Sequence, residues 1–339
     1  MSNIDRQRLA ALAATRPFYK GRYRNITRTP AHGLGDFLKW QMAPGKRFPP
    51  GHRYPLNKPD THLLAHPGTA PHLTWIGHSS FLYQFNGCNV LTDPVFSERA
   101  SPFAFAGPKR YTPAALQVKD LPTIDVVLIS HNHYDHLDDA TVRALHQRFG
   151  DHPVFCVPEG LADWFRKRGI TRLVELSWWQ SQTLDQGEVF CVPAQHFSGR
   201  GPGDTNASLW CGWILEIGAM RLYFAGDTGY GPVFKTIGEV FGHVDLALLP
   251  IGAYDPRWFM GPVHVAPEEA VHIHRDVGAR MSVGMHWGAF VLTDEPMDEP
   301  PRRLHQALQE QGIDPHSFHV MQHGQTLVLD DGTVSVNER

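Results

Sequence analysis

Cysteine is scarce in this chain of 339 residues, and its four copies do not form a pair with metal-binding or redox spacing. Cys88, Cys156, Cys191 and Cys211 lie far apart, each in an apolar stretch. This usage excludes a disulfide framework and a cluster of thiolate ligands. We therefore expect four buried free thiols, which suit a reducing compartment.

The chain also lacks a strong excess of charge of one sign and a long apolar run. Its 31 Lys and Arg against 34 Asp and Glu give a formal net charge of -3, so no basic field attracts nucleic acid. No stretch reaches the ~18 apolar residues of a membrane span. The first 19 residues lack the apolar core of a secretory signal. We expect a cytoplasmic protein whose contact with membranes, where there is any, is peripheral.

Histidine, by contrast, is abundant, with 21 copies, and three of them lie in one short turn. An apolar run over residues 124–129 predicts a buried strand, and the turn follows it directly, with the sequence Ser130-His131-Asn132-His133-Tyr134-Asp135-His136. The spacing allows His131 and His133 to face one metal ion, and Asp135 and His136 to face a neighbouring one. Imidazole and carboxylate groups are ordinary ligands of Zn²⁺ and similar cations.

Three further residues of ligand type each follow a predicted apolar strand. They are His196, Asp227 and His286. Singly, each is more often a turn or cap residue, but together with the turn they make a complete set of seven ligands. Asp227 is the natural bridge, because a carboxylate can offer one oxygen to each of two metals.

The order of predicted elements indicates an α+β fold. Strand hairpins come first, strand–helix alternation follows, and the same order then repeats. The main predicted helices span residues 138–149, 159–168, 232–241, 267–277 and 301–311, and the predicted strands include 73–76, 80–85, 88–92, 154–157, 209–217, 221–225, 246–250 and 281–285. Two sheets face to face, with helices on their outer faces, satisfy this order.

Several stretches of the chain resemble one known family. His131-x-His133-x-Asp135-His136, with His196, Asp227 and His286, is similar to the metal-binding motif of the metallo-β-lactamase superfamily. Local sequence more closely resembles N-acylphosphatidylethanolamine-hydrolysing phospholipase D and its bacterial relatives. The stretches that carry this resemblance include Trp75-Ile76-Gly77-His78-Ser79, Leu91-Thr92-Asp93-Pro94, Gly107-Pro108-Lys109-Arg110, His196-Phe197-Ser198-Gly199-Arg200, Gly226-Asp227-Thr228-Gly229 and His286-Trp287-Gly288.

The resemblance implies a four-layer αββα sandwich for the hydrolase domain, which we place at residues 71–339. Residues 1–70 are rich in Pro, Gly, His, Arg and Lys and show little periodicity, so we expect an extended arm packed on this domain. It implies that His131, His133 and His196 hold one metal, that Asp135, His136 and His286 hold a second, and that Asp227 bridges them. Two Zn²⁺ ions are the implied cofactors, although ligands of this N/O type do not distinguish Zn²⁺ from Mn²⁺ or Fe²⁺.

The implied activity is a metal-dependent phosphodiesterase of phospholipase D type. A hydroxide generated between the two metals would attack the phosphorus of an N-acylphosphatidylethanolamine-like lipid. A lactonase, or another hydrolase of small esters or phosphoesters on the same site, is the main alternative, because one dinuclear scaffold hosts many chemistries. A non-catalytic metal-binding protein is a second alternative.

Other residues receive more specific expectations. Asp93 is expected to accept a hydrogen bond from a ligand histidine. Asp135 and Asp227 are expected to act in catalysis as ligands. His264 is expected to contact the phosphate or to protonate the leaving group. Tyr254 and Arg257 are candidate substrate contacts.

A lipid substrate also needs an apolar route to the metals. Candidate residues for its lining or rim are Phe96, Phe103, Phe105, Trp178, Trp179, Trp258, Phe259 and Met260. Two roles remain open for the N-terminal arm: docking to a membrane surface and contact within a homodimer.

Overall fold

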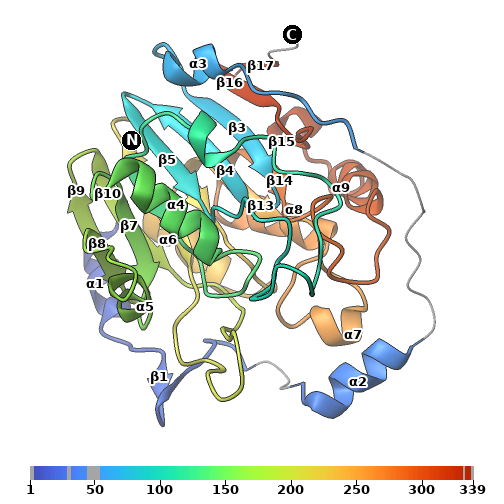
Figure 1. Ribbon diagram of the computed structural model, residues 1–339. Helices are drawn as coiled ribbons and strands as arrows, with labels where there is room; N and C mark the ends of the chain where they lie inside the picture. The colour runs from blue at the N-terminus through green and yellow to red at the C-terminus, as the bar shows by residue number, and fades with distance from the viewer. Residues whose placement is uncertain (1–3, 29–31, 44–53, 331–332, 337–339) are drawn as a thin grey trace.

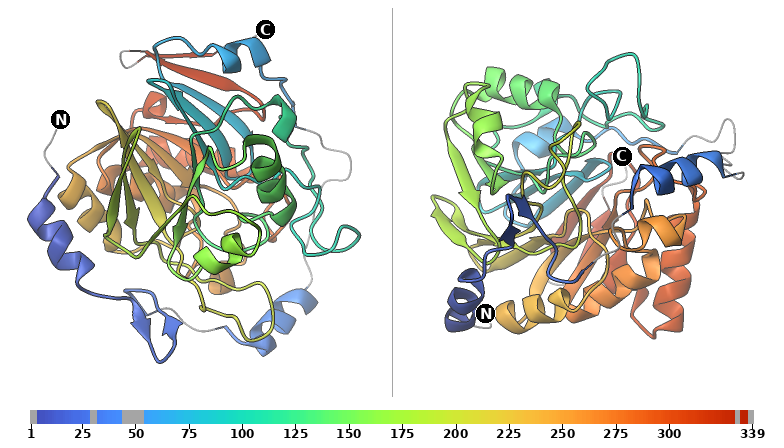
Figure 2. Two further views of the ribbon diagram at one scale, coloured as in Figure 1. Left: turned by 60° about the vertical axis from the view of Figure 1, so that its left-hand side comes forward. Right: turned by 90° about the horizontal axis from the view of Figure 1, so that it is seen from below.

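Two β-sheets lie face to face in the centre of the molecule, and helices cover their outer faces (Figures 1 and 2). The computed structural model describes residues 4–28, 32–43, 54–330 and 333–336. This arrangement is the αββα sandwich expected from the sequence. It brings strand ends from both sheets to one edge of the fold, where the predicted ligands lie.

The first sheet has eight strands and is built from both ends of the domain. Pairing is antiparallel up to β5 and parallel from β5 to β8. Its strand order is β17 (Thr333–Val336), β16 (Thr326–Asp330), β3 (His72–Gly77), β4 (Ser80–Phe85), β5 (Cys88–Thr92), β6 (Val126–Leu128), β7 (Val154–Pro158) and β8 (Leu173–Leu176).

The second sheet has seven strands. It is antiparallel from β9 to β12 and parallel from β12 to β15. Its strand order is β15 (Phe318–His319), β14 (Ala279–Met285), β13 (Val244–Pro250), β12 (Met220–Phe224), β11 (Gly212–Ile217), β10 (Gly187–Val192) and β9 (Ser181–Leu184).

Two apolar clusters hold these layers together. The larger one fills the space between the sheets and continues to helices α6 (Val233–Phe241), α8 (Pro267–Asp276) and α9 (Glu299–Glu310). The smaller one joins the outer face of the eight-stranded sheet to α3 (Thr61–Ala65), α4 (Asp139–Phe149) and α5 (Ala162–Arg166). All four cysteines are free and buried, as predicted.

Local sequence explains the most clearly defined turns and helix ends. Asn86 and Gly87 both have positive φ, which is the type I′ geometry that the β4–β5 hairpin requires. Asp138 caps α4 by accepting a hydrogen bond from the backbone N–H of Ala140, and Gly150 ends the helix with a positive φ. The structure therefore confirms both ends of the helix predicted after the ligand turn.

The segment before residue 71 contains more regular structure than an extended chain would. It includes α1 (Arg6–Ala13), the β1–β2 hairpin (Phe18–Tyr19 and Arg22–Tyr23), α2 (Leu34–Met42) and α3. Helix α1 contacts α6, and α2 lies beside the short helix α7 (Arg257–Met260) in Figure 1 and in the right-hand view of Figure 2. Among the described residues, no helix has the length and hydropathy needed to cross a membrane.

Candidate metal centre

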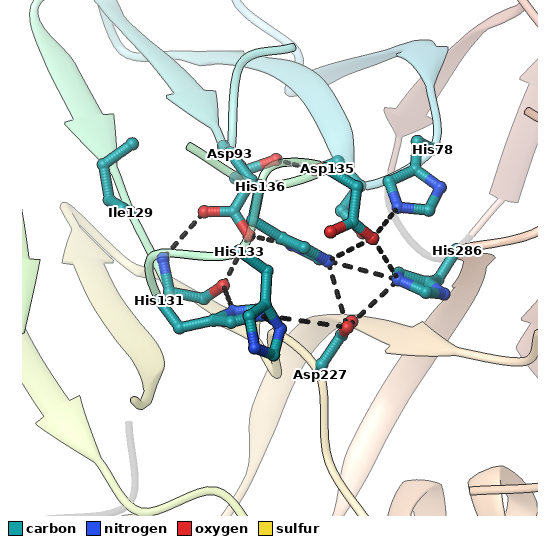
Figure 3. Close-up of polar contacts among 12 residues, drawn as sticks. His78, Asp93, Ile129, His131, His133, Asp135, His136, Asp227 and His286 are labelled. Carbon is teal, nitrogen blue, oxygen red and sulfur yellow. Dashed lines mark hydrogen bonds and ion pairs between the residues drawn. The ribbon is translucent and has the colours of Figure 1, made fainter. Parts of the chain in front are cut away.

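Side chains of ligand type meet where strands of both sheets end, as Figure 3 shows. The His131–His136 turn follows β6, and His196 lies in the loop after β10. Asp227 follows β12, and His286 directly follows β14. The fold thus gathers residues that are up to 155 positions apart in the chain (131 to 286). All seven predicted ligands therefore lie close together at one site.

The first group consists of His131, His133 and His196. Nε2 of His131 lies 2.8 Å from Nδ1 of His133, and Nε2 of His196 lies 3.2 Å from the same atom. Three imidazole nitrogens at such distances can all face one small cation. The Nδ1 of His196 is occupied by the carbonyl oxygen of Val263 at 2.9 Å, which leaves Nε2 directed into the group.

The second group consists of Asp135, His136 and His286, and the structure adds His78 to it. Oδ2 of Asp135 lies 3.4 Å from Nε2 of both His136 and His286. The two Nε2 atoms are 3.1 Å apart. This group offers two nitrogens and a carboxylate oxygen to one cation, with the ring of His78 beside them.

Asp227 lies between the two groups. Its Oδ2 is 3.0 Å from Nε2 of both His136 and His286. The same oxygen is 4.0 Å from Nε2 of His131 and 3.8 Å from Nε2 of His196. A single carboxylate therefore reaches both groups, which is the position that a bridging ligand needs.

Asp93 holds the ligand turn in position through contacts with Ser130 and His136. Its Oδ2 lies 2.6 Å from Nδ1 of His136, and its Oδ1 accepts a hydrogen bond from the backbone N–H of Ser130 at 2.7 Å. The Ser130 hydroxyl also donates to Asp93 and lies 2.9 Å from Nδ1 of His131. These contacts occupy the Nδ1 atoms of two ligand histidines and direct their Nε2 atoms toward the site.

The histidines of the first group are held neutral. Burial, together with the nearby His196, lowers the pKa of His133 to about 3. Burial likewise lowers the pKa of His196 to about 4. Neutral imidazole is the form that binds a metal, so no proton has to leave these two rings at neutral pH.

The second group is charged and tightly coupled. Burial opposes the charge on His286, but the carboxylates of Asp227 and Asp135 raise its pKa to about 9. Burial would also raise the pKa of the Asp227 carboxyl, yet His136 and His286 hold that pKa well below its usual range. A cation bound here takes the place of the protons on these rings, so protons and metal compete at the second group.

The donor set fits divalent cations. It combines imidazole nitrogens with two carboxylates; most of these side chains are buried, while His133 and Asp135 are partly exposed. Oδ1 of Asp227 is buried and has no hydrogen-bond partner among the described residues, and such an atom is costly unless a cation or a donor satisfies it. The His and Asp clusters therefore indicate a site for divalent metal.

His264 lies beside both groups. Its ring centroid is 5.0 Å from that of His196 and 5.6 Å from that of His286. Its side chain is partly exposed, and its Nδ1 has no hydrogen-bond partner among the described residues. A substrate group that reaches the metals would meet this ring.

The structure does not bring Tyr254 and Arg257 to the site as free substrate contacts. Tyr254 is fully buried, and its hydroxyl donates to Glu299 at 2.8 Å. Arg257 donates to Glu269 and to the carbonyl oxygen of His264, each at 2.8 Å. Both side chains already have partners inside the protein, so their contacts indicate packing of the α7–α9 region and support of the His264 backbone.

The aromatic residues expected to line a lipid route fall into two groups, one buried and one exposed. Trp178 and Trp179 are buried members of the larger apolar cluster. Phe103, Phe105 and Trp258 are exposed. Bulk and apolarity do not distinguish these cases in a sequence, because both a core and a binding surface use large aromatic side chains.

Sequence reasoning assigned no role to His78, which the structure places at the site. Its Nε2 lies 3.1 Å from Oδ2 of Asp135, and its ring centroid is 4.0 Å from that of His286. The sequence signal was its position directly after a predicted strand; in the structure it lies between β3 and β4 with a positive φ of 58°. A polar residue in such a conformation at a strand end merits attention.

Known proteins place this fold and site in a family. The beta-lactamase superfamily domain profile matches residues 88–287. The N-acyl-phosphatidylethanolamine-hydrolyzing phospholipase D 1 of Caenorhabditis elegans is 43% identical over 242 residues, which are 68% of each chain. The mitochondrial protein of that activity from Saccharomyces cerevisiae is 41% identical over 239 residues, which are 68% of this chain but only 50% of the yeast protein.

A solved structure supports the fold alone. The isothiocyanate hydrolase from Delia radicum gut bacteria superposes with a TM-score of 0.61 at 20% sequence identity, covering 78% of this chain and all of that chain (100%). The fold and the buried His/Asp clusters define a metal-dependent hydrolase. The chain belongs to the metallo-β-lactamase superfamily, and within it to the relatives of the N-acylphosphatidylethanolamine-hydrolysing phospholipases D.

Proposed function

We propose that this protein is a dinuclear metal-dependent phosphodiesterase that hydrolyses N-acylphosphatidylethanolamine-like phospholipids. The observation that carries the proposal is the position of Asp227, whose Oδ2 lies within 3.0 to 4.0 Å of histidines from both ligand groups. Two cations held in this way would activate a shared water and neutralise charge on a phosphoryl group. Zn²⁺ is the metal we propose, on the basis of the nitrogen-rich donor set.

The residues around the metals act by orientation. His131, His133 and His196 would hold one cation, Asp135, His136 and His286 would hold the second, and Asp227 would be shared between them. Asp93 fixes the ring of His136. His264 lies beside the first group and would offer a nitrogen to a phosphoryl oxygen or to the leaving oxygen.

In the reaction, a water-derived hydroxide forms a bond to phosphorus in line with the departing alcohol. The bond between phosphorus and the ethanolamine oxygen breaks, and a proton goes to that oxygen. The products are phosphatidate and N-acylethanolamine. Hydrolysis in ¹⁸O-water tests this route: label in phosphatidate supports it, whereas label found only in the alcohol product contradicts attack at phosphorus.

An exposed apolar surface beside the site supports a lipid substrate. We name it the aromatic patch; its residues are Phe37, Leu38 and Met42 of α2 and Trp258 of α7, whose exposed fractions are 43, 47, 77 and 45%. Trp40 of α2 stacks on Phe259 of α7 at 5.2 Å between centroids, so the two helices present one surface. Such a surface fits the apolar part of a membrane interface.

Charge and position also connect the aromatic patch with a phospholipid. Lys39 Nζ lies 5.0 Å from the ring centroid of Trp258, which places a cation where anionic headgroups would lie. The chain leads from α7 to His264 within four residues, and the backbone N–H of His264 donates to the carbonyl oxygen of Met260 at 2.8 Å. The aromatic patch is therefore joined to His264 by a short stretch of chain.

A substrate panel tests the proposal. Metal-loaded protein is offered N-acylphosphatidylethanolamine in mixed micelles, bis-p-nitrophenyl phosphate and a set of lactones, with Asp227→Asn as the blank. We expect turnover of both phosphodiesters, abolished by chelation and restored by Zn²⁺. Turnover of lactones without that of either diester would overturn the proposal in favour of an ester hydrolase.

A further inference from the structure

Asn25, in the segment before the sheets, pairs with the backbone of the predicted ligand His196. Its Nδ2 donates to the carbonyl oxygen of His196 at 2.8 Å, and its Oδ1 accepts from the backbone N–H of His196 at 3.1 Å. His196 lies in the loop after β10, outside the hydrogen-bond ladder of the sheet. One amide side chain thus satisfies both backbone groups of a buried residue that no strand pairs.

Asn25 is itself held in position. Nε1 of Trp210 lies 2.9 Å from Oδ1 of Asn25 and 3.0 Å from the carbonyl oxygen of Ala194, two residues before His196. Trp210 is buried. The indole of Trp210 therefore links Asn25 to the backbone of Ala194, just before His196. The Asn25 amide cannot rotate without losing three hydrogen bonds.

Neighbouring residues connect the same segment to the rest of the loop. The backbone N–H of Tyr23 donates to the carbonyl oxygen of Asn206 at 3.0 Å, and Arg22 donates to that of Gly203 at 2.7 Å. Residues 22–25 therefore run along the 196–206 loop and fix it at both ends. The matched family profile begins at residue 88, so this segment lies outside the region that defines the family.

These contacts complete the constraints on the His196 ring. Asn25 fixes the backbone, and the carbonyl oxygen of Val263 fixes Nδ1 at 2.9 Å. The remaining nitrogen, Nε2, then faces His133 at 3.2 Å. Supports of this kind around a metal ligand usually matter to affinity by about 10- to 100-fold.

We propose that Asn25 is a positioning residue of the metal centre: the N-terminal segment reaches into the site and sets the geometry of the cation held by His131, His133 and His196. The inference rests on the proposed role of His196 as a ligand. It predicts that the segment before the sheets is required for full metal affinity and not only for stability of the fold.

The test is a titration of Co²⁺ into the metal-free full-length protein, followed by visible absorption, together with thermal unfolding with and without metal. In Asn25→Ala we expect affinity for the first equivalent of Co²⁺ to fall about tenfold, with an altered d–d spectrum. The metal-induced rise in the midpoint of unfolding should shrink accordingly. The matched control is Arg8→Ala. Arg8 lies in the same N-terminal segment and forms an exposed ion pair with Glu239 of α6, so this variant should bind Co²⁺ like the wild type.

Several results would overturn the inference. One is an Asn25→Ala protein with wild-type Co²⁺ affinity and spectrum, and another is a lowered midpoint of the metal-free protein with an unchanged metal-induced rise. If Asn25→Ala does not fold, Asn25→Asp decides: it keeps the acceptor for His196 N–H, loses the donor, and adds a negative charge that by itself favours cation binding. Weaker Co²⁺ binding in this variant supports the inference, and binding at or above the wild-type affinity contradicts it. A wild type that binds no Co²⁺ would contradict the proposed function itself, before Asn25 is considered.

Discussion

Asp93 and His136 are joined by a contact of 2.6 Å between Oδ2 and Nδ1, and neither side chain is accessible to solvent. The same carboxylate accepts from the backbone N–H and the hydroxyl of Ser130. Three donors thus converge on two oxygens, which only a carboxylate can satisfy. Asp93 connects the end of β5 to the ligand turn and orients the ring that shares Asp227 with His286.

Replacing Asp93 with Asn should weaken metal binding by about 10- to 100-fold, mainly at the second group. The amide has one acceptor oxygen where the carboxylate has two, so its NH₂ group must face either Ser130 or His136. Competition with a chromogenic chelator measures the two Zn²⁺ affinities. Asp163→Asn, which changes an exposed partner of Arg166, is the control. Wild-type affinities in Asp93→Asn would show that the Asp93–His136 contact does not tune the metals.

His78→Phe should weaken the second metal by about tenfold and lower turnover in proportion, because Asp135 loses the hydrogen bond that fixes its Oδ2. Phe keeps the ring that packs against Phe290 at 5.2 Å between centroids, so the fold should persist. Metal content after dialysis at limiting Zn²⁺ measures the effect. His305→Ala, on the exposed face of α9, should retain both metals. Two tightly bound metals in His78→Phe would assign His78 a packing role only.

The contrast between Asp138 and His78 shows what a single sequence can predict about this protein. The N-cap of α4 and the Asn86-Gly87 hairpin are local, since each depends on residues within about four positions of one another. The start of α5 was wrong, because Gly160 adopts a φ of 93° and the carbonyl oxygen of Glu159 accepts from Leu209 N–H instead of beginning a helix.

The site follows the same logic. The ligand turn was predicted because its residues are adjacent in sequence, and the distant ligands because each follows an apolar strand. His78 is 57 positions from Asp135, and Asn25 is 171 positions from His196. Only the packing of the two sheets and the N-terminal segment creates these contacts. The partner of Tyr254 was equally hidden in the sequence, because its hydroxyl donates to Glu299 on α9, 45 positions away.

Removing the apolar side chain of Trp258 should separate a lipid interface from the chemistry. Trp258→Ser should lower binding to vesicles that contain anionic phospholipid several-fold, together with the turnover of lipid substrate. Hydrolysis of bis-p-nitrophenyl phosphate should stay within about twofold of the wild type, since this soluble diester needs no interface. Val320→Ser, also an exposed apolar residue but outside the aromatic patch, is the control. Equal losses on lipid and soluble substrates would argue against the patch as a docking surface.

His274 should contribute to acid sensitivity of the fold. It is buried on α8, and burial lowers its pKa to about 4. Its hydrogen-bond and ring partners are Ser282, Ser317 and Phe318, none of which carries a charge. The unfolded chain, with a pKa near 6.5, therefore binds a proton that the folded protein refuses between about pH 6.5 and pH 4.

Because the folded protein binds this proton less readily, the stability contributed by neutral His274 is present above about pH 6.5 and is lost as the pH falls toward 4. Linkage gives a loss of about 2 kcal/mol between pH 7 and pH 5 from this residue. In His274→Gln, which cannot titrate, the free energy of unfolding should fall less over that interval than in the wild type. Urea unfolding of the metal-free proteins at both pH values measures the difference, so that competition between protons and metal does not contribute. Parallel pH dependences in the two proteins would assign the acid sensitivity to other buried groups, among which His323 has a pKa lowered to about 3.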